Sequence, residues 1–419
     1  MTERLLQFIW QFQYFNKINL VTSKGEKVVI VHQGQGNNHQ GPDFLEARVR
    51  IQDQVWVGSV ELHIDASGWH KHSHHCDSNY NNVILHVVWN NDDERVAQSI
   101  PTLVLNGRVP GILLSQYESW MNSSTFIPCG QMITSVDEMV WLGWKHRLVS
   151  ERLQRKSEIV RGLLDTNNFH WELTLWWMLA KNLGLHVNAE AFEEIMQSIP
   201  YAVLLKHKKS IHQVECLLLG QAGLLQGEFH DKYALMLQKE YHFYQTKYGL
   251  RKINVPVHFL RMRPVAFPTV RLAQLAMIIH STDQLFSTIL VTDDLKKIKN
   301  YFEITGNDYW HYHFLLGEES VYQPKTLGMS MINSIVVNTI VPMLFSYGAY
   351  HQDEKLKEKA ISLLEQTEGE MNLFIREFMK LGVKNKNAHN SQALLELKSQ
   401  YCDKRRCLDC AVGHSIMKR

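Results

Sequence analysis

Residues 41–89 read GPDFLEARVRIQDQVWVGSVELHIDASGWHKHSHHCDSNYNNVILHVVW, and they hold most of the chemically informative side chains of this chain. Residues 44–51 and 55–64 alternate between apolar and polar positions, as strands with one buried face do. Residues 83–89 are almost entirely apolar, which is typical of a central strand buried on both faces. The stretch therefore predicts a small sheet that carries carboxylates and histidines.

The segments on either side of this sheet complete the predicted architecture. Residues 3–16 have apolar side chains at helical spacing, and residues 18–33 contain two β-branched runs separated by Lys24-Gly25-Glu26, a hairpin signal. After about residue 130 the period is helical, including single helices at 169–183, 270–281 and 352–381. We expect an α+β domain at 1–125, a mainly α-helical domain at 130–395 and a Cys-rich tail at 396–419.

Composition limits the classes of protein to consider. The chain has 419 residues, is 45% hydrophobic and carries a formal charge of +2, so a nucleic-acid interface must be a local basic patch. No uninterrupted apolar run approaches the roughly 18 residues of a membrane span, because Asn338 and Pro342 interrupt the longest one. With no secretory signal, the six cysteines predict reduced thiols in a cytoplasmic protein without membrane contact.

Two carboxylates on neighbouring strands form the first candidate site. Asp43 opens one strand and Glu61 lies within the next, so together with the Leu62 carbonyl they could hold Mg²⁺ or Mn²⁺. Such an ion activates water and neutralises a phosphoryl oxygen. His63 shares the face of Glu61 and could position the water. The alternative is structural: Asp43 caps a turn, or Glu61 pairs with an arginine across the sheet. Asp43 also has the parity of the apolar positions in its strand, so its direction stays open.

Pro42-Asp43 and Glu61-Leu62-His63, within the element order αβββαβ, resemble the PD-(D/E)xK nuclease superfamily over residues 3–90. The resemblance implies a nuclease-like mixed sheet and metal-dependent phosphodiester hydrolysis, with Asp43, Glu61 and His63 as catalytic residues. His63 stands where that superfamily usually has Lys. The whole chain also resembles an uncharacterised bacterial family of unknown function that has GPDF, VELH and C-terminal cysteines.

The histidine run offers a rival site. His70, His72 and His74 alternate, and H-x-H-x-H followed by an acid could bind Zn²⁺ with one position open. A zinc-dependent hydrolase would use His63, His70, His72 and Asp77. With the metal at the carboxylates instead, His70, His72 and Asp77 could contact substrate, and Tyr80 could stack on a base. The alternative without a functional role is a solvated histidine-rich loop.

The second cluster is at the C-terminal end of the sequence. Cys402-x4-Cys407-x2-Cys410-x3-His414 brings together three thiols and an imidazole, which suit Zn²⁺. With Cys129 or Cys76 as a distant fourth thiol, an iron–sulfur cluster is the alternative. Three ordinary thiols at the end of a helix would give the same pattern.

These observations favour a metal-dependent hydrolase that cleaves DNA or RNA, with Asp43, Glu61 and His63 as its catalytic residues. The first alternative is an inactive nuclease-like scaffold that binds nucleic acid or protein, because His replaces Lys in the motif. The second is the zinc-dependent hydrolase. Protein partners are not predictable from the sequence.

Overall fold

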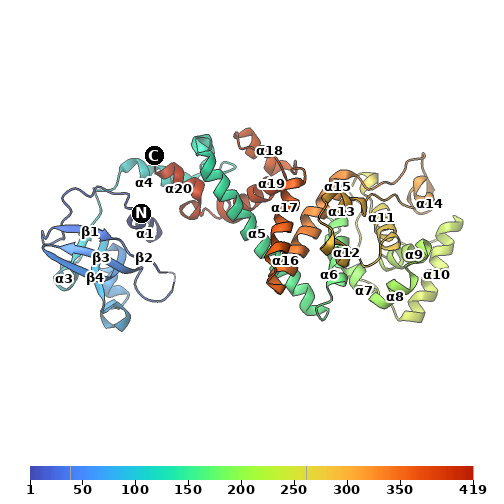
Figure 1. Ribbon diagram of the computed structural model, residues 1–419, viewed down its shortest axis with the longest axis horizontal. Helices are drawn as coiled ribbons and strands as arrows, with labels where there is room; N and C mark the ends of the chain where they lie inside the picture. The colour runs from blue at the N-terminus through green and yellow to red at the C-terminus, as the bar shows by residue number, and fades with distance from the viewer. Residues whose placement is uncertain (38, 261, 419) are drawn as a thin grey trace. The chain divides into compact units, whose positions relative to one another are not determined.

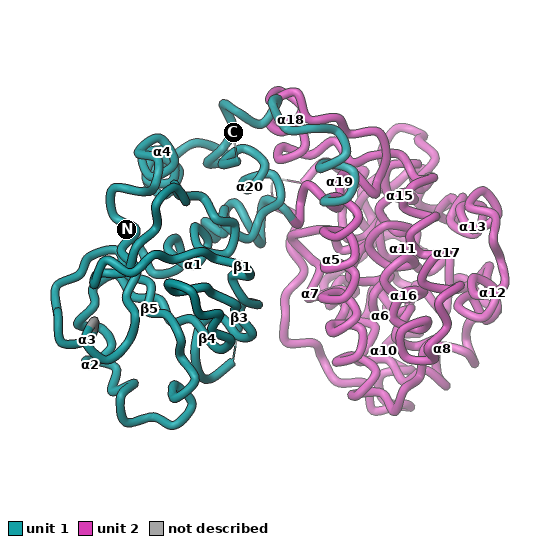
Figure 2. Tube along the Cα trace, turned by 60° about the vertical axis from the view of Figure 1, so that its left-hand side comes forward, with its two compact units in different colours: residues 1–144, 397–419 teal, residues 145–396 magenta. Residues whose placement is uncertain are grey.

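The structure is a computed structural model that describes residues 1–37, 39–260 and 262–418. The chain forms two compact units: residues 1–144 with 397–419, and residues 145–396 (Figure 2). An α+β segment followed by a mainly helical one is therefore confirmed. The predicted boundaries lie at 125–130 and 395–396, and in this division the Cys-rich tail groups with residues 1–144 in unit 1.

Unit 1 is built on a mixed six-stranded sheet (Figure 1). Its strands are β1 (Val28–His32), β2 (Gln35–Gly36), β3 (Phe44–Ile51), β4 (Gln54–Asp65), β5 (Val83–Asn90) and β6 (Thr102–Val104). The order is β1-β3-β4-β5-β6, with β2 paired to β3. Strand β3 pairs antiparallel with both β1 and β4, whereas β4, β5 and β6 run parallel. The strand that carries Glu61 and His63, β4, is thus internal.

A bulge in β3 changes the predicted direction of its side chains. Phe44 pairs with Val60 but Ala47 pairs with Gly58, and Glu46 has a φ of 59°. The extra residue reverses the alternation, so Phe44 is 2% exposed while Leu45, expected inside, is 39% exposed. Asp43 consequently lies on the face opposite to Phe44, which is the face of Glu61.

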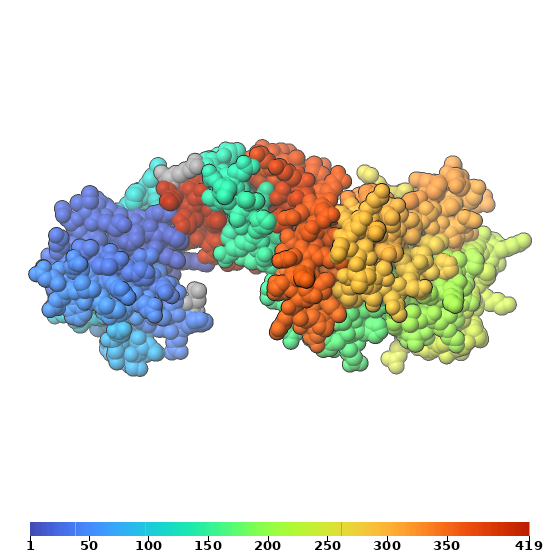
Figure 3. All heavy atoms as spheres, in the orientation of Figure 1, coloured from blue at the N-terminus to red at the C-terminus, as the bar shows by residue number. Residues whose placement is uncertain are grey.

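Short helices and turns surround the sheet in unit 1. They are α1 (Glu3–Phe12), α2 (Gly68–Lys71), η1 (His74–Cys76), η2 (Ser78–Tyr80), α3 (Glu94–Ser99), α4 (Gly111–Asn122), η3 (Gly130–Ser135), η6 (Leu397–Cys402), η7 (Cys407–Asp409) and α20 (Ala411–Met417). Helix α1 packs on β4 and ends earlier than predicted, because Gln13 adopts the left-handed conformation. In the space-filling view the C-terminal residues (red) adjoin the segment that follows the sheet (teal) (Figure 3).

Side chains join the first helix to the last. Arg4 forms an ion pair with Asp409, and the Tyr14 hydroxyl lies 2.7 Å from His414 Nε2. The His414 ring also packs edge-on against Phe12, with ring centroids 4.0 Å apart. Two ends of the sequence therefore form one packed region beside the sheet.

Unit 2 is an assembly of helices with a small hairpin. Its elements are α5 (Glu138–Thr166, which begins in unit 1), α6 (Trp171–Leu183), α7 (Ala189–Ser198), α8 (Tyr201–His207), α9 (Ile211–Gln221), α10 (Lys232–Tyr248), η4 (Pro264–Ala266), α11 (Pro268–Ser281), α12 (Leu285–Val291), α13 (Leu295–Asn300), α14 (Asp308–His311), β7 (His313–Leu315), β8 (Glu318–Glu319), α15 (Met329–Ile335), η5 (Val336–Ile340), α16 (Val341–His351), α17 (Glu354–Gln366), α18 (Leu373–Lys380) and α19 (Ala388–Glu396). Helices α9 and α10 approach closely at Gly220, where a Cβ would lie 2.0 Å from the Tyr241 ring.

The prediction of a single helix at 352–381 is wrong. Helix α17 ends at Gln366, and Asn372 caps α18 by accepting a hydrogen bond from the Ile375 amide. Between them, Gly369 lies so close to Asn385 that a Cβ would be 2.8 Å from its side-chain nitrogen. Mixed charges along both segments conceal this break, because an amphipathic pattern continues through a turn.

One helical stretch, Met329–His351, is long and apolar enough to cross a membrane by length and composition. In the structure 78% of its apolar window is buried, and core helices pass the same test. Its centre, η5, is a π-helical segment that precedes Pro342, whose nitrogen cannot donate a hydrogen bond.

A buried carboxyl group in unit 2 makes its stability depend on pH. Glu215 is fully buried and accepts hydrogen bonds from Tyr233, Asn307 and Trp310. Burial raises the pKa of Glu215 to about 7 from an ordinary 4.5. The unfolded chain therefore loses this proton first, so the free energy of unfolding falls as pH rises from about 4.5 through 7. We expect a loss on the order of 3 kcal/mol.

The variant Glu215→Gln keeps the shape and removes the ionisation, so the calorimetric transition of unit 2 should lose this slope. The exposed Glu228→Gln is the matched control. Equal pH slopes in the wild type and Glu215→Gln would contradict the assignment.

Candidate metal centre

The two predicted carboxylates lie side by side through backbone hydrogen bonds. The Asp43 amide donates to Glu61 Oε2 over 3.0 Å, and the Leu62 amide donates to Asp43 Oδ2 over 3.0 Å. Gln7 of α1 donates its side-chain amide to Asp43 Oδ1 at 2.8 Å. The bulge in β3 is what makes this arrangement possible. Leu62 thus contacts the pair through its N–H, whereas its carbonyl was the predicted ligand.

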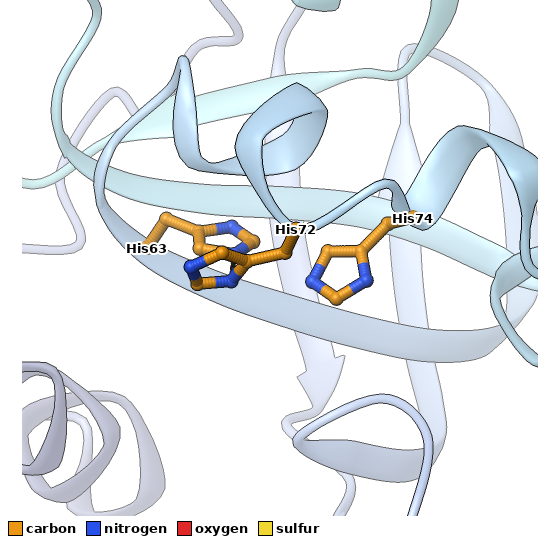
Figure 4. Close-up of side chains that lie close together, drawn as sticks. All are labelled: His63, His72 and His74. Atoms are coloured by element: carbon orange, nitrogen blue, oxygen red, sulfur yellow. Dashed lines mark hydrogen bonds between the residues drawn. The ribbon is translucent and has the colours of Figure 1, made fainter.

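Three imidazoles converge beside Glu61. His63 comes from β4, His72 follows α2 and His74 begins η1; one ring nitrogen of each lies within 4.8 Å of the others (Figure 4). Glu61 Oε1 is 3.3 Å from His74 Nε2 and 3.8 Å from His63 Nε2. Among these contacts imidazoles, not an arginine, lie beside the Glu61 carboxylate. The alternative in which Glu61 pairs with an arginine across the sheet is therefore not observed.

A second layer of rings holds the imidazoles in place. His63 Nδ1 is 2.9 Å from His86 Nε2, and its Nε2 is 3.3 Å from His72 Nδ1. The His74 ring stacks on Tyr80 with centroids 3.9 Å apart. Gly68 leaves room for the His63 ring, because a Cβ there would lie 2.6 Å from His63 Cδ2. Both ring nitrogens of His63 are therefore engaged, and its orientation is fixed.

Burial makes it costly for both carboxyl groups of the metal-free site to ionise. It raises the pKa of Asp43 to about 6 and, together with repulsion from Asp43, that of Glu61 to about 8. Burial and the neighbouring imidazoles lower the pKa of His63 to about 3, and burial lowers that of His74. His74 Nε2 is buried without a hydrogen-bond partner. A divalent cation would supply the positive charge that two ionised carboxylates need.

The donor set fits a borderline ion better than Mg²⁺. Three imidazoles lie beside the Glu61 carboxylate, and those of His72 and His74 could be ligands together with Glu61 Oε1, because both nitrogens of His63 are engaged. Imidazole suits Zn²⁺ and similar ions, whereas Mg²⁺ and Mn²⁺ prefer carboxylate and other oxygen ligands. Asp43 adds a second carboxylate, and both of its oxygens already accept hydrogen bonds.

The comparison with protein families gives one match. A family model described as a protein of unknown function (DUF2851) matches residues 3–373. The chain belongs to this family. No curated protein and no solved structure matches it. Membership in the DUF2851 family thus agrees with the resemblance to an uncharacterised family, whereas a relationship to PD-(D/E)xK nucleases finds no support in these comparisons.

Other predicted site residues of this DUF2851 protein lie outside the cluster. His70 is exposed and contacts His75, with 3.4 Å between their Nδ1 atoms. Asp77 caps η2 by accepting a hydrogen bond from the Asn79 amide at 2.9 Å. His414 contacts Tyr14 and Phe12 of the N-terminal segment. The predicted zinc ligands therefore do not all lie together: His63 and His72 do, but His74 lies beside them in place of His70 and Asp77.

Sequence reasoning missed two residues of the centre, Gln7 and His86, and named His74 in the histidine run without including it in either predicted site. All three are in direct contact with the predicted residues. His86 had a usable signal: it is the single polar residue in the apolar run 83–89, and it pairs with Glu61 in the parallel ladder.

A further group in the DUF2851 chain lies in unit 2. One ligand atom each of His146, Glu365 and His389 lies within 4.8 Å of the others. Only His389 is buried, and burial lowers its pKa to about 4. Exposed groups of this kind are common without an ion.

Proposed function

We propose that Asp43, Glu61 and the imidazoles of His72 and His74 hold a divalent ion, and that this centre hydrolyses phosphodiester bonds in DNA or RNA. The observation that carries the proposal is the buried Asp43–Glu61 pair, whose repulsion no cationic side chain offsets among the contacts of Glu61 described here. A buried pair of acids beside neutral imidazoles is stable in its ionised form only with a metal ion.

The placement of the two acids supports a phosphodiester substrate. Asp43 directly precedes β3, and Glu61 lies in the adjacent β4 behind an N-terminal helix, as the resemblance to nucleases implies. Lys71, His70 and His75 are exposed on the segment that also carries His72 and His74. Such side chains can contact phosphate oxygens without contributing to the metal set.

Each residue can be given a role. A bound ion would activate water and neutralise charge on the phosphate. Asp43 orients Glu61 through its own amide, and Gln7 holds Asp43. His63 is neutral near pH 7 and hydrogen bonded at both nitrogens, so it orients His72 and does not supply the positive charge of the usual lysine. His74, with its free Nε2 beside Glu61, is the residue to bind the ion.

A zinc-dependent hydrolase is the second candidate, and one observation favours it. Glu61 with the imidazoles of His72 and His74 gives three protein ligands, which leaves the fourth tetrahedral position of Zn²⁺ open for water, while Asp43 is occupied by Gln7 and Leu62. In this case Asp43 is a positioning residue only. The inactive scaffold remains the third candidate, and hydrolysis assays separate it from both enzymes.

Metal binding is the first test. We expect Mn²⁺ to raise the melting temperature of the wild type, by an amount equivalent to about 2.7 kcal/mol at a hundredfold excess over Kd. His74→Gln should weaken binding by about a hundredfold or more, since it removes a ligand. His39→Gln, an exposed histidine of the same unit, is the matched control. Identical titrations of His74→Gln and the wild type would contradict the proposed centre.

The second test follows cleavage of labelled DNA and RNA with Mn²⁺ or Zn²⁺. The nuclease proposal expects Asp43→Asn to lose both Mn²⁺-dependent stabilisation and cleavage. If Asp43→Asn still binds Zn²⁺ and the protein hydrolyses other esters, the zinc hydrolase is the better assignment. Tight metal binding without any hydrolysis would favour the scaffold.

A further inference from the structure

Four buried cysteines of unit 1 come from distant parts of the sequence. Cys129, Cys402, Cys407 and Cys410 are each 6–8% exposed, and none forms a disulfide. Cys129 directly precedes η3 and Cys410 directly precedes α20, and these two elements pack together. Cys402 ends η6, which contacts η7, where Cys407 begins.

The surroundings of Cys410 are adapted to a thiolate. Burial raises the pKa of Cys410 to about 11, while the backbone N–H groups of Gly413 and Val412 act on its sulfur in the opposite direction. Gly413 is packed so tightly on the Cys407–Cys410 loop that a Cβ would lie 2.3 Å from the Cys407 carbonyl oxygen. Donors aimed at a sulfur stabilise its anionic, metal-ligating form.

The four thiols lie in one buried region. Cys410 and Cys407 lie close enough to Cys129 to interact with it electrostatically, and Cys410, Cys129 and Cys407 do so with Cys402. Cys76, the other candidate for a fourth thiol, is exposed. Four buried thiols therefore lie near one another, and a soft metal bound there would replace their protons.

We propose that Cys129, Cys402, Cys407 and Cys410 together ligate an iron–sulfur cluster. Cys129 is the fourth ligand, and His414 is not one, because its ring contacts Tyr14 and Phe12 of the N-terminal segment. Four cysteine thiolates are the usual ligand set of [2Fe–2S] and [4Fe–4S] clusters.

The spacing of the sulfurs favours a cluster over a single Zn²⁺. With Zn–S bonds of about 2.3 Å, tetrahedral ligation places sulfurs about 3.8 Å apart. Within the described part of the chain, the ligand groups found within 4.8 Å of one another consist of imidazoles and a carboxylate, and no three of these sulfurs form one. A cluster carries several iron and sulfide atoms between its thiolates, and so it spans wider separations.

The centre would also brace the region next to Asp43. It would join η3 to α20, whose flanking residues Asp409 and His414 contact Arg4 and Tyr14. Between Arg4 and Tyr14, α1 carries Gln7, the partner of Asp43. The cluster is therefore assigned a structural role, and its existence does not depend on the hydrolytic proposal.

Metal and sulfide analysis of the full chain, purified without oxygen, tests this inference. We expect bound iron with acid-labile sulfide, a broad visible absorption, and loss of both in Cys129→Ser. Cys76→Ser, an exposed thiol of the same unit, is the matched control and should keep the cluster. Cys410→Ser provides a second ligand variant, and wild-type analysis does not depend on the folding of any variant.

Three results would overturn the proposal. Stoichiometric zinc without sulfide would show a four-thiolate site of another kind, and iron retained in Cys129→Ser would exclude Cys129 as a ligand. Wild-type protein that binds neither iron nor sulfide after anaerobic reconstitution, with all four thiols open to alkylation on unfolding, would exclude the cluster. None of these outcomes bears on Mn²⁺ binding at Glu61, which a separate titration follows.

Discussion

Replacing Glu61 by glutamine is expected to stabilise the metal-free protein at alkaline pH while abolishing its stabilisation by Mn²⁺. In the folded protein burial and Asp43 raise the pKa of Glu61 from 4.5 to about 8. The unfolded chain releases this proton first, so the free energy of unfolding falls as pH rises from about 4.5 and reaches its lowest value above 8. At about 1.4 kcal/mol for each pKa unit, the loss is on the order of 5 kcal/mol.

Glutamine suits the metal-free site for a geometric reason. Its oxygen can accept the hydrogen bond of the Asp43 amide, as Glu61 Oε2 does. Its amide nitrogen then takes the place of Oε1, 3.3 Å from the unpartnered His74 Nε2, and can donate to it. The substitution thus removes the repulsion without leaving a new unsatisfied group.

Melting curves of chelator-treated protein between pH 5 and pH 9 check this prediction. The wild type should lose stability across this range, and Glu61→Gln should be flatter and more stable at pH 9. Glu46→Gln, an exposed glutamate on the neighbouring strand, is the control and should follow the wild type. A Glu61→Gln protein less stable than wild type at pH 9 would mean that the carboxylate already has a cationic partner.

The second large effect is expected at Glu396. There, removing the charge lowers the free energy of unfolding instead of raising it. This residue of unit 2 is 2% exposed and accepts hydrogen bonds from Arg152 and Arg155 of α5. Arg152 also donates to Gln392 at 2.6 Å. Removing the charge of Glu396 leaves a mostly buried guanidinium without its counterion, which costs about 3–5 kcal/mol. Glu396→Gln should therefore destabilise unit 2 strongly.

Denaturant unfolding of the full chain, followed by the transition of unit 2, measures this loss. The matched control is Glu151→Gln, which alters a more exposed i,i+4 pair with Arg147 on the same helix and should cost less than about 0.5 kcal/mol. Similar losses in the two variants would contradict the difference in burial. The double variant Arg152→Met, Glu396→Leu should recover part of the stability, because neither charge then stays buried alone.

The sheet and its carboxylates were predictable because their signals are local. Alternation over residues 55–64 and the apolar run at 83–89 follow from which faces are buried, and β4 and β5 appear where these patterns predict them. The direction of Asp43 was not predictable, since it depends on one extra residue near Glu46 that no periodic pattern reveals. The break at Gly369 was hidden in the same way by continuous amphipathic spacing.

The centre required contacts that sequence spacing does not contain. His74 replaces His70 because the segment after β4 folds into α2 and η1, so the H-x-H-x-H run is not an extended strand. His86 and Gln7 come from elements that meet β4 only in three dimensions. Cys129 likewise joins the C-terminal cysteines through the packing of η3 on α20.

The interrupted sequence of unit 1 has a consequence for its synthesis on the ribosome. Residues 1–144 emerge first, but the segment 397–419 that completes this unit emerges only after all of unit 2. Domains generally fold as units during translation, starting from the N-terminal side. Arg4, Tyr14 and Cys129 must therefore wait for their partners while unit 2 acquires its own structure. Unit 2, which is synthesised later, is therefore expected to fold first, and unit 1 completes its folding only when residues 397–419 are available.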